Sequence, residues 1–207
     1  MQKFIPIPEP TEFDQKCRQK GNTWLAKNPA AKRPRDYWSP FRADLAQGFN
    51  NLCGYSVMYD PTATVDHFLS FHNYRHLSYE WSNYRYAAGW INSSKKDLDD
   101  RLLDPFEIED TWFEILLPSL QLVLTDKVPK EQRLKAQFTL QHLGLDYNER
   151  ILRQREEWFR MYEQGEITLA GLAKKAPLIA RAIEKQKINP LNSKQGEEPN
   201  GCPINYN

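Results

Sequence analysis

Four polar side chains in the middle of the chain have types that could act together in chemistry: Asp66, His67, Asn83 and Asn92. A histidine near its solution pKa can take a proton from water at neutral pH, which makes His67 a candidate general base. Asp66 and the amide oxygen of Asn92 would give two ligands to a hard divalent cation such as Mg²⁺ or Mn²⁺, with water and substrate phosphate completing its shell. Such an ion stabilises the charge that develops on a phosphodiester and its leaving oxygen.

Asn83 ends a polar and aromatic stretch, His67–Asn83, that we expect to be a long loop. An amide donates and accepts hydrogen bonds at once, which suits a side chain that holds this loop behind His67. A structural role is the alternative, because an Asp-His pair also occurs in ordinary turns and asparagine is common in loops. The spacing by itself does not decide between the two.

Short β-prone runs and a helix are expected to position these residues. Val57–Tyr59 and Thr62–Val65 flank an Asp-Pro turn and are predicted to pair as a hairpin. If Asp66 and His67 both continue the second strand, their side chains point in opposite directions. A short helix is expected from Asn92 to about Leu98.

The flanking segments are predicted to be mostly helical, which makes the fold class α+β. Before the site we expect helices from Thr11 to about Lys27 and from Phe41 to Phe49. After the site, Trp112–Leu117 and Leu120–Leu124 are expected to form a second hairpin. Three more helices are predicted at Pro129–His142, Asn148–Gln164 and Thr168–Gln186, with Pro177 weakening the third.

The 207 residues divide into four parts. Residues 1–38 form a basic N-terminal helix and linker, and residues 39–106 form a core that carries the site. Residues 107–186 form a mostly helical C-terminal subdomain, and residues 187–207 form a polar tail that is expected to be disordered.

The formal net charge is only +1, but the charges are unevenly distributed. Eight basic residues and one acid lie between Lys16 and Arg42, whereas eight acids and one base lie between Asp97 and Glu114. A basic segment beside an acidic one is compatible with a polyanion bound on one face. A solvated basic arm is the alternative. The candidate nucleic-acid contacts are Lys32, Arg33, Arg35, Arg42 and Lys95.

Cysteine content and hydropathy bear on the compartment. Three cysteines, odd in number and far apart, argue against a disulfide scaffold. The first ten residues have no apolar signal-like run, and no 18-residue apolar run occurs. These features predict a cytoplasmic protein with no membrane association.

One motif pattern resembles a known family. The pattern is similar to that of the HNH endonucleases, which have the ββα-metal fold, and most similar to the nuclease subunit of Septu anti-phage systems and its retron-linked relatives. The similarity covers roughly residues 40–160. It is carried by Val65-Asp66-His67-Phe68, by Tyr74, Leu77, Tyr79, Trp81 and Asn83, by Asn92 and Lys95, by Leu103-Asp104-Pro105, and by Leu143-Gly144-Leu145-Asp146 with Arg153.

The resemblance implies a metal-dependent endonuclease that hydrolyses phosphodiester bonds in DNA, in anti-phage defence. It implies that His67 activates water, that Asp66 and Asn92 bind a Mg²⁺-like ion, and that Asn83 holds the loop. The chain departs from the family where four cysteines bind a structural zinc. The corresponding positions are Cys53, Ser56, Ala88 and Ile91, so structural zinc is not expected.

Two alternatives to DNA cleavage stay open. One is the same chemistry on RNA. The other is a catalytically weakened HNH-like subunit that serves as an interaction module for an ATPase partner through its helical tail. The presence of Asp66, His67, Asn83 and Asn92 favours the enzyme, and the missing cysteines favour the interaction module.

Overall fold

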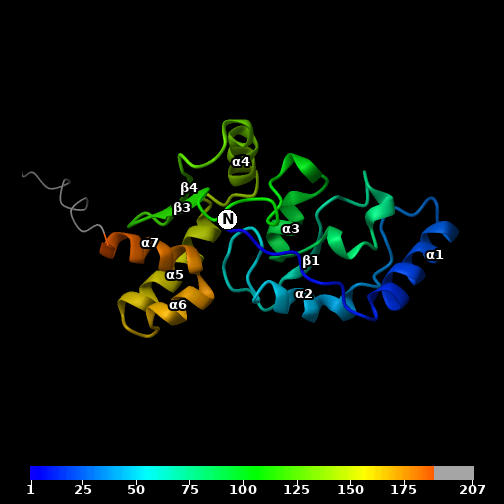
Figure 1. The fold of residues 1–207 in the computed structure, drawn as a ribbon, viewed down its shortest axis with the longest axis horizontal. Helices are drawn as coiled ribbons and strands as arrows, with labels where there is room; N and C mark the ends of the chain where they lie inside the picture. The colour runs from blue at the N-terminus through cyan, green and yellow to red at the C-terminus, as the bar shows by residue number, and fades with distance from the viewer. Residues whose placement is uncertain (189–207) are drawn as a thin grey trace, which may run out of the picture.

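The computed structural model describes residues 1–188, which form an elongated molecule with helices and two small sheets (Figure 1). α1 (Gln19–Lys27) lies at one end and continues a π-helical turn at Asp14–Arg18. β1 (Thr64–His67), α2 (Arg42–Gly48) and α3 (Gly89–Lys95) lie in the centre, and the C-terminal helices lie at the other end. The predicted α+β class is confirmed.

The first sheet contains β1 and β2 (Tyr84–Ala87) in antiparallel register, with Asp66 opposite Arg85 and His67 opposite Tyr84. The predicted pairing of β1 with Val57–Tyr59 is wrong. Val57 has a φ of +58°, which a β-branched residue in a strand does not adopt, and only Tyr59 forms an isolated bridge, to Leu52.

A tight turn replaces the expected strand at residues 53–58. The Val57 N–H donates to the Cys53 oxygen, and the Cys53 N–H donates to the Met58 oxygen, both at 2.9 Å. Because these hydrogen bonds close the segment on itself, its backbone is not available to β1. The partner of β1 comes instead from the far side of the long loop.

α3 begins three residues before the position predicted for it and ends at Lys95. It stops there because Lys96 has a φ of +49°, with which a right-handed α-helix cannot continue. The order along the chain is therefore strand, strand, helix, with α3 packed against β1.

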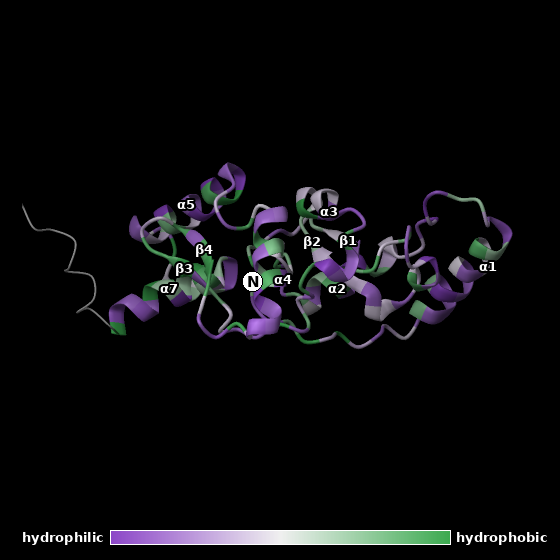
Figure 2. Ribbon diagram, turned by 90° about the horizontal axis from the view of Figure 1, so that it is seen from above, coloured by the Kyte–Doolittle hydropathy of each residue, from purple (hydrophilic) through white to green (hydrophobic). Residues whose placement is uncertain are grey.

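The C-terminal half agrees closely with the sequence-based expectation. β3 (Phe113–Leu116) and β4 (Gln121–Leu124) form the second hairpin. α4 (Lys130–His142) and α5 (Glu149–Glu163) are the first two predicted helices. Figure 2 shows hydrophobic residues on the strands and on the parts of α5 and α7 beside them.

The third predicted helix is two helices, α6 (Leu169–Lys175) and α7 (Pro177–Ile188). Proline lacks an N–H and disfavours helical backbone in the residue before it, and Ala176 has φ −146° and ψ 68°. The expected tail begins inside α7, and its residues 189–207 lie outside the described part of the chain.

The extended N-terminal segment packs along the molecule. The Phe4 N–H donates to the Pro105 oxygen at 2.9 Å, and the Phe4 and Phe49 rings lie 4.6 Å apart. Further along, Phe13 packs against Trp81 and Tyr84 at 5.2 and 5.7 Å. Aromatic side chains thus connect the N-terminal part to the loop and to β2. No helix among residues 1–188 combines the length and apolar character that crossing a bilayer requires.

Candidate functional site

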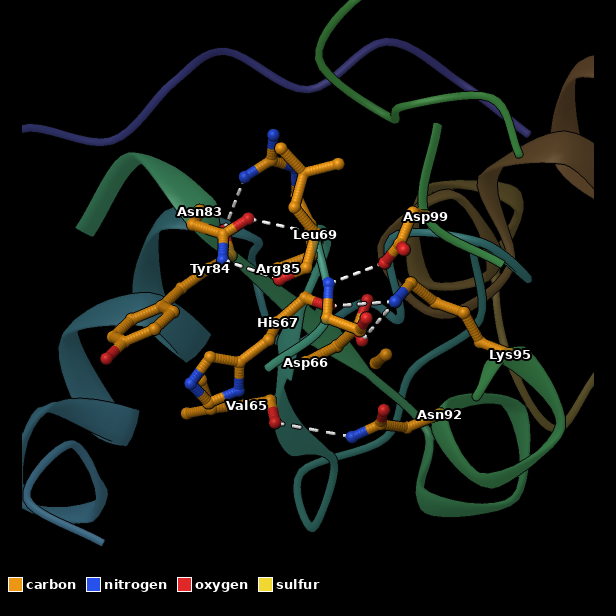
Figure 3. A network of polar contacts seen from close by, with 12 residues as sticks. Val65, Asp66, His67, Leu69, Asn83, Tyr84, Arg85, Asn92, Lys95 and Asp99 are labelled. Carbon is orange, nitrogen blue, oxygen red and sulfur yellow. Dashed lines mark hydrogen bonds and ion pairs between the residues drawn. The ribbon is translucent and has the colours of Figure 1, made fainter. Parts of the chain in front are cut away.

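His67 is the last residue of β1 (Figure 3). Its ring is held on three sides. Trp38 and Tyr84 pack edge-on against it, with centroids at 4.6 and 4.9 Å. Nε2 lies 2.9 Å from the main-chain oxygen of Ser78. A carbonyl oxygen only accepts, so Nε2 carries a proton and donates it, which leaves the lone pair on Nδ1.

The environment of His67 favours the neutral ring. Desolvation by burial lowers its pKa below the ordinary value, against the opposing effect of the Ser78 hydrogen bond. The neutral tautomer with a free Nδ1 is the form that can accept a proton from water.

Asn83 holds the loop that leads away from His67. Its Oδ1 accepts from the Leu69 N–H at 2.8 Å, and its Nδ2 donates to the oxygens of Leu69 and Leu77 at 2.9 and 3.1 Å. Its main-chain oxygen accepts from the Phe68 N–H at 2.8 Å. One buried amide therefore joins both ends of the loop, and the loop in turn presents the Ser78 oxygen to His67.

Asp66 points to the other side of β1, as alternation along a strand requires (Figure 3). Its side chain is only 1% exposed. Tyr55 donates its hydroxyl to Oδ2 at 2.7 Å, and the Lys95 ammonium lies 3.1 Å from Oδ1. Burial, more than the nearby carboxylate, raises the pKa of Tyr55 well above its usual range, so the phenol stays a donor.

Lys95 was expected to contact nucleic acid, and the structure places it in the interior with 1% exposure. Its Nζ also donates to the main-chain oxygen of His67 at 2.8 Å. In this arrangement the ammonium is enclosed by the Asp66 carboxylate and the end of β1, so it does not reach a phosphate at the surface.

Asn92 projects from α3 toward β1, on the same side as Asp66. Its Nδ2 donates to Thr64 Oγ1 at 3.1 Å and to the Val65 oxygen at 3.3 Å. Both amide hydrogens thus have partners on β1, and within residues 1–188 no hydrogen bond to its Oδ1 is formed. The amide oxygen is the atom that could bind a cation.

The donor types of Asp66 and Asn92 fit a hard divalent cation. Mg²⁺ is commonly bound through one or two carboxylates together with water and substrate phosphate, so a full set of protein ligands is not needed. Each carboxylate oxygen also has a further lone pair beside those used by Tyr55 and Lys95. Within residues 1–188 no group of three or more histidine, cysteine or acidic side chains could hold an ion.

Four buried positions of this chain correspond to the zinc cysteines of the HNH family that its sequence resembles. Cys53, Ser56, Ala88 and Ile91 are each less than 5% exposed. The Ala88 N–H points at Cys53 Sγ at 3.3 Å, which places the 53–58 turn beside the junction of β2 and α3. Side-chain packing and main-chain hydrogen bonds thus hold these segments together where the resembled family has a zinc ion.

The basic arm runs beside the loop. Arg75 donates to the Ala31 oxygen at 2.9 Å, and the Tyr79 hydroxyl donates to the Arg35 oxygen at 2.8 Å. The Lys32, Arg33 and Arg35 side chains are exposed. The arm is therefore anchored through its backbone while these three cationic side chains face solvent. Arg42, the fourth predicted surface contact, begins α2 and is also exposed.

Several polar residues that support the site were missed from the sequence. Arg85 forms a buried ion pair with Asp104, with Nε 2.7 Å from Oδ1. Asp99 accepts from the main-chain N–H of Ser70 and from Asn73, and so holds the start of the loop. No local pattern indicates either residue, because β2 is buried at every position and Asp99 has a φ of +51°.

The chain matches none of the protein-family models, and it matches no curated protein.

Proposed function

We propose that this chain is a metal-dependent endonuclease of the HNH type that hydrolyses phosphodiester bonds in DNA and acts in anti-phage defence. The observation that carries the proposal is the placement of Asp66-His67 at the end of β1, with Asn92 of α3 hydrogen-bonded to Thr64 and Val65 of the same strand. The strand–strand–helix order of β1, β2 and α3 supports the ββα-metal core that the sequence resembles.

His67 is the proposed general base. Nδ1 takes a proton from water, the water oxygen forms a bond to phosphorus, and the bond from phosphorus to one ester oxygen breaks. The leaving oxygen then takes a proton from solvent. Ser78 fixes the tautomer of His67, and Asn83 positions the loop that carries Ser78, so Asn83 acts through His67.

Asp66 and Asn92 are the proposed ligands of a Mg²⁺ or Mn²⁺ ion. When bound, such an ion neutralises charge that develops on the phosphate and the leaving oxygen. Lys95 stabilises the buried carboxylate of Asp66 and also fixes the His67 main chain, which keeps the two neighbours in register on opposite sides of the strand.

A catalytically weakened HNH-like subunit is the second candidate, and the pairing of Asp66 favours it. The carboxylate is buried and already has a cation and a hydroxyl as partners. In that role the C-terminal helices would bind an ATPase partner. RNA is the alternative substrate for the enzyme, since the proposed chemistry acts on the phosphodiester itself.

A plasmid assay separates these candidates. Supercoiled DNA and a matched single-stranded RNA are incubated with the protein and Mg²⁺ or Mn²⁺, with EDTA as the control. The enzyme is expected to nick the DNA only when metal is present. Preferential loss of the RNA would assign RNA as the substrate. Persistence of both nucleic acids would favour the weakened subunit.

A further inference from the structure

A basic hollow of about 820 Å³ lies between α2 and the junction of α6 and α7. Arg42 contributes from α2, and Lys174 and Lys175 contribute from the last turn of α6. Asn50 and Asn51 line it from the loop after α2. These segments are far apart in the sequence, so the hollow exists only in the folded chain.

The charge of the hollow is of one sign. Its lining includes three cationic side chains and four side-chain amides, from Gln2, Gln47, Asn50 and Asn51, and no carboxylate. Within the described part of the chain, Arg42, Lys174 and Lys175 form no ion pair. Three uncompensated cations in one concave surface favour an anionic ligand.

Local structure keeps these groups directed to the hollow. The Lys175 ammonium lies over the Tyr59 ring at 3.2 Å from its centroid, and the Tyr59 N–H donates to the Lys175 oxygen at 2.8 Å. The nearby Asp60 carboxylate accepts the N–H and the hydroxyl of Thr62, both at Oδ1. The negative end of the α6 dipole is opposed by the positive end of α7, which begins at Pro177 in the same hollow.

The hollow is also connected to the candidate site. Arg42 Nη1 lies 3.4 Å from the oxygen of Ala63, the residue that precedes β1. The next residue, Thr64, accepts a hydrogen bond from Asn92. Arg42 and Asn92 therefore contact neighbouring residues of one segment, and a nucleic-acid strand bound at Asn92 can extend toward Arg42.

We propose that this hollow binds phosphates of the nucleic-acid backbone flanking the bond that is cut, through Arg42, Lys174 and Lys175. The inference rests on the proposed function and extends it, because it gives the C-terminal helices a part in holding DNA. The amides of Asn50 and Asn51 donate to the same phosphate oxygens, whereas the bases are not read here.

The experiment measures the affinity for a short fluorescent DNA duplex in EDTA at several NaCl concentrations. The Lys174→Gln/Lys175→Gln variant is compared with Lys127→Gln/Lys130→Gln. The second variant removes two basic groups that do not line the hollow, one after the end of β4 and one at the start of α4. Each lost phosphate contact reduces the magnitude of the negative slope of log K against log salt by about 0.9. We expect the first variant to lose about two units and the second to keep the wild-type slope.

Further variants and ligands complete the test. Lys174→Arg/Lys175→Arg keeps both charges and is expected to keep the slope. Equal slopes for the two glutamine variants would overturn the inference, and so would tight binding of inorganic pyrophosphate with an unchanged DNA slope, which indicates a small-anion site. Because binding is measured in EDTA, it does not depend on cleavage. A reduced slope in the first variant would therefore support the hollow even if the protein were inactive in the plasmid assay, and that inactivity would count against hydrolysis alone.

Discussion

The Lys95 ammonium lies 3.1 Å from Asp66 Oδ1 and 2.8 Å from the main-chain oxygen of His67, and so links α3 to both residues at the end of β1. Both charged side chains are 1% exposed. A buried pair of this kind costs desolvation, but removal of one partner leaves the other charge without compensation. Lys95 is therefore expected to hold the site together and not to contact nucleic acid at the surface.

Lys95→Met is expected to destabilise the fold by about 3–5 kcal/mol, because it leaves the Asp66 carboxylate buried and unpaired. Urea unfolding measures this loss, with Lys96→Met, at the exposed neighbouring position, as the control. The double variant Asp66→Asn/Lys95→Met should regain part of the stability. Equal stability of Lys95→Met and Lys96→Met would contradict the buried pair.

Asn83→Ala is expected to lower stability by roughly 1–3 kcal/mol, since three hydrogen bonds to the loop are lost and the partly buried main-chain N–H and oxygen of Leu69 lose their partner. Asn83→Asp keeps the acceptor for the Leu69 N–H and loses the donors. Thermal unfolding with hydrogen exchange of residues 68–83 measures the effect. Unchanged protection of the loop in Asn83→Ala would show that other contacts hold it.

Asp66→Asn and Asn92→Ala are expected to raise the Mn²⁺ concentration needed for half-maximal cleavage, because each changes one of two oxygen ligands in a sparse site. Asn22→Ala, at an exposed position of α1, is the matched control. The readout is the metal titration of plasmid cleavage together with direct Mn²⁺ binding. A metal dependence identical to the wild type in both ligand variants would remove them from the metal site.

Cys17 is expected to be chemically inert in the folded protein. Burial raises its pKa from 9.0 to about 12, against the smaller effect of the Tyr84 hydroxyl contact. At pH 8 its thiolate fraction is then about a thousandfold below that of an unfolded thiol, which follows from the tenfold change per pKa unit. Alkylation at Cys17, mapped by mass spectrometry with and without urea, measures this difference.

The same shift determines how stability depends on pH. Between pH 9 and about 12 the unfolded chain ionises this thiol while the folded chain keeps it protonated, so rising pH favours unfolding. The contribution of Cys17 is therefore complete below pH 9 and is lost as the pH rises toward about 12. Cys17→Ala should show a shallower decline in this range, and an equal decline in both proteins would contradict the shift.

Local sequence signals were sufficient for most of the C-terminal half. The β-prone runs around Pro118-Ser119 and the proline and glycine positions around α4 predicted elements that the structure contains. The positions of Asp66 and His67 on opposite sides of one strand also followed from alternation.

Long-range pairing explains the errors near the site. β2 is buried at every position and shows no alternation of polar and apolar residues, so no element is predicted between the end of the loop at Asn83 and the helix at Asn92. The β-propensity of Val57 was overridden by the tight 53–58 turn. Lys95 was read as an exposed base because sequence alone does not reveal that α3 turns it toward Asp66.

The central claim is that His67 takes a proton from water, and the single-turnover cleavage rate of His67→Ala tests it most directly. His72→Ala, an exposed histidine of the same loop, is the control, and near-ultraviolet circular dichroism checks the fold. We predict that His67→Ala loses about 10²–10⁴-fold in rate while His72→Ala keeps the wild-type rate. Cleavage by purified His67→Ala at the wild-type rate, with contaminating nucleases excluded, would contradict the claim.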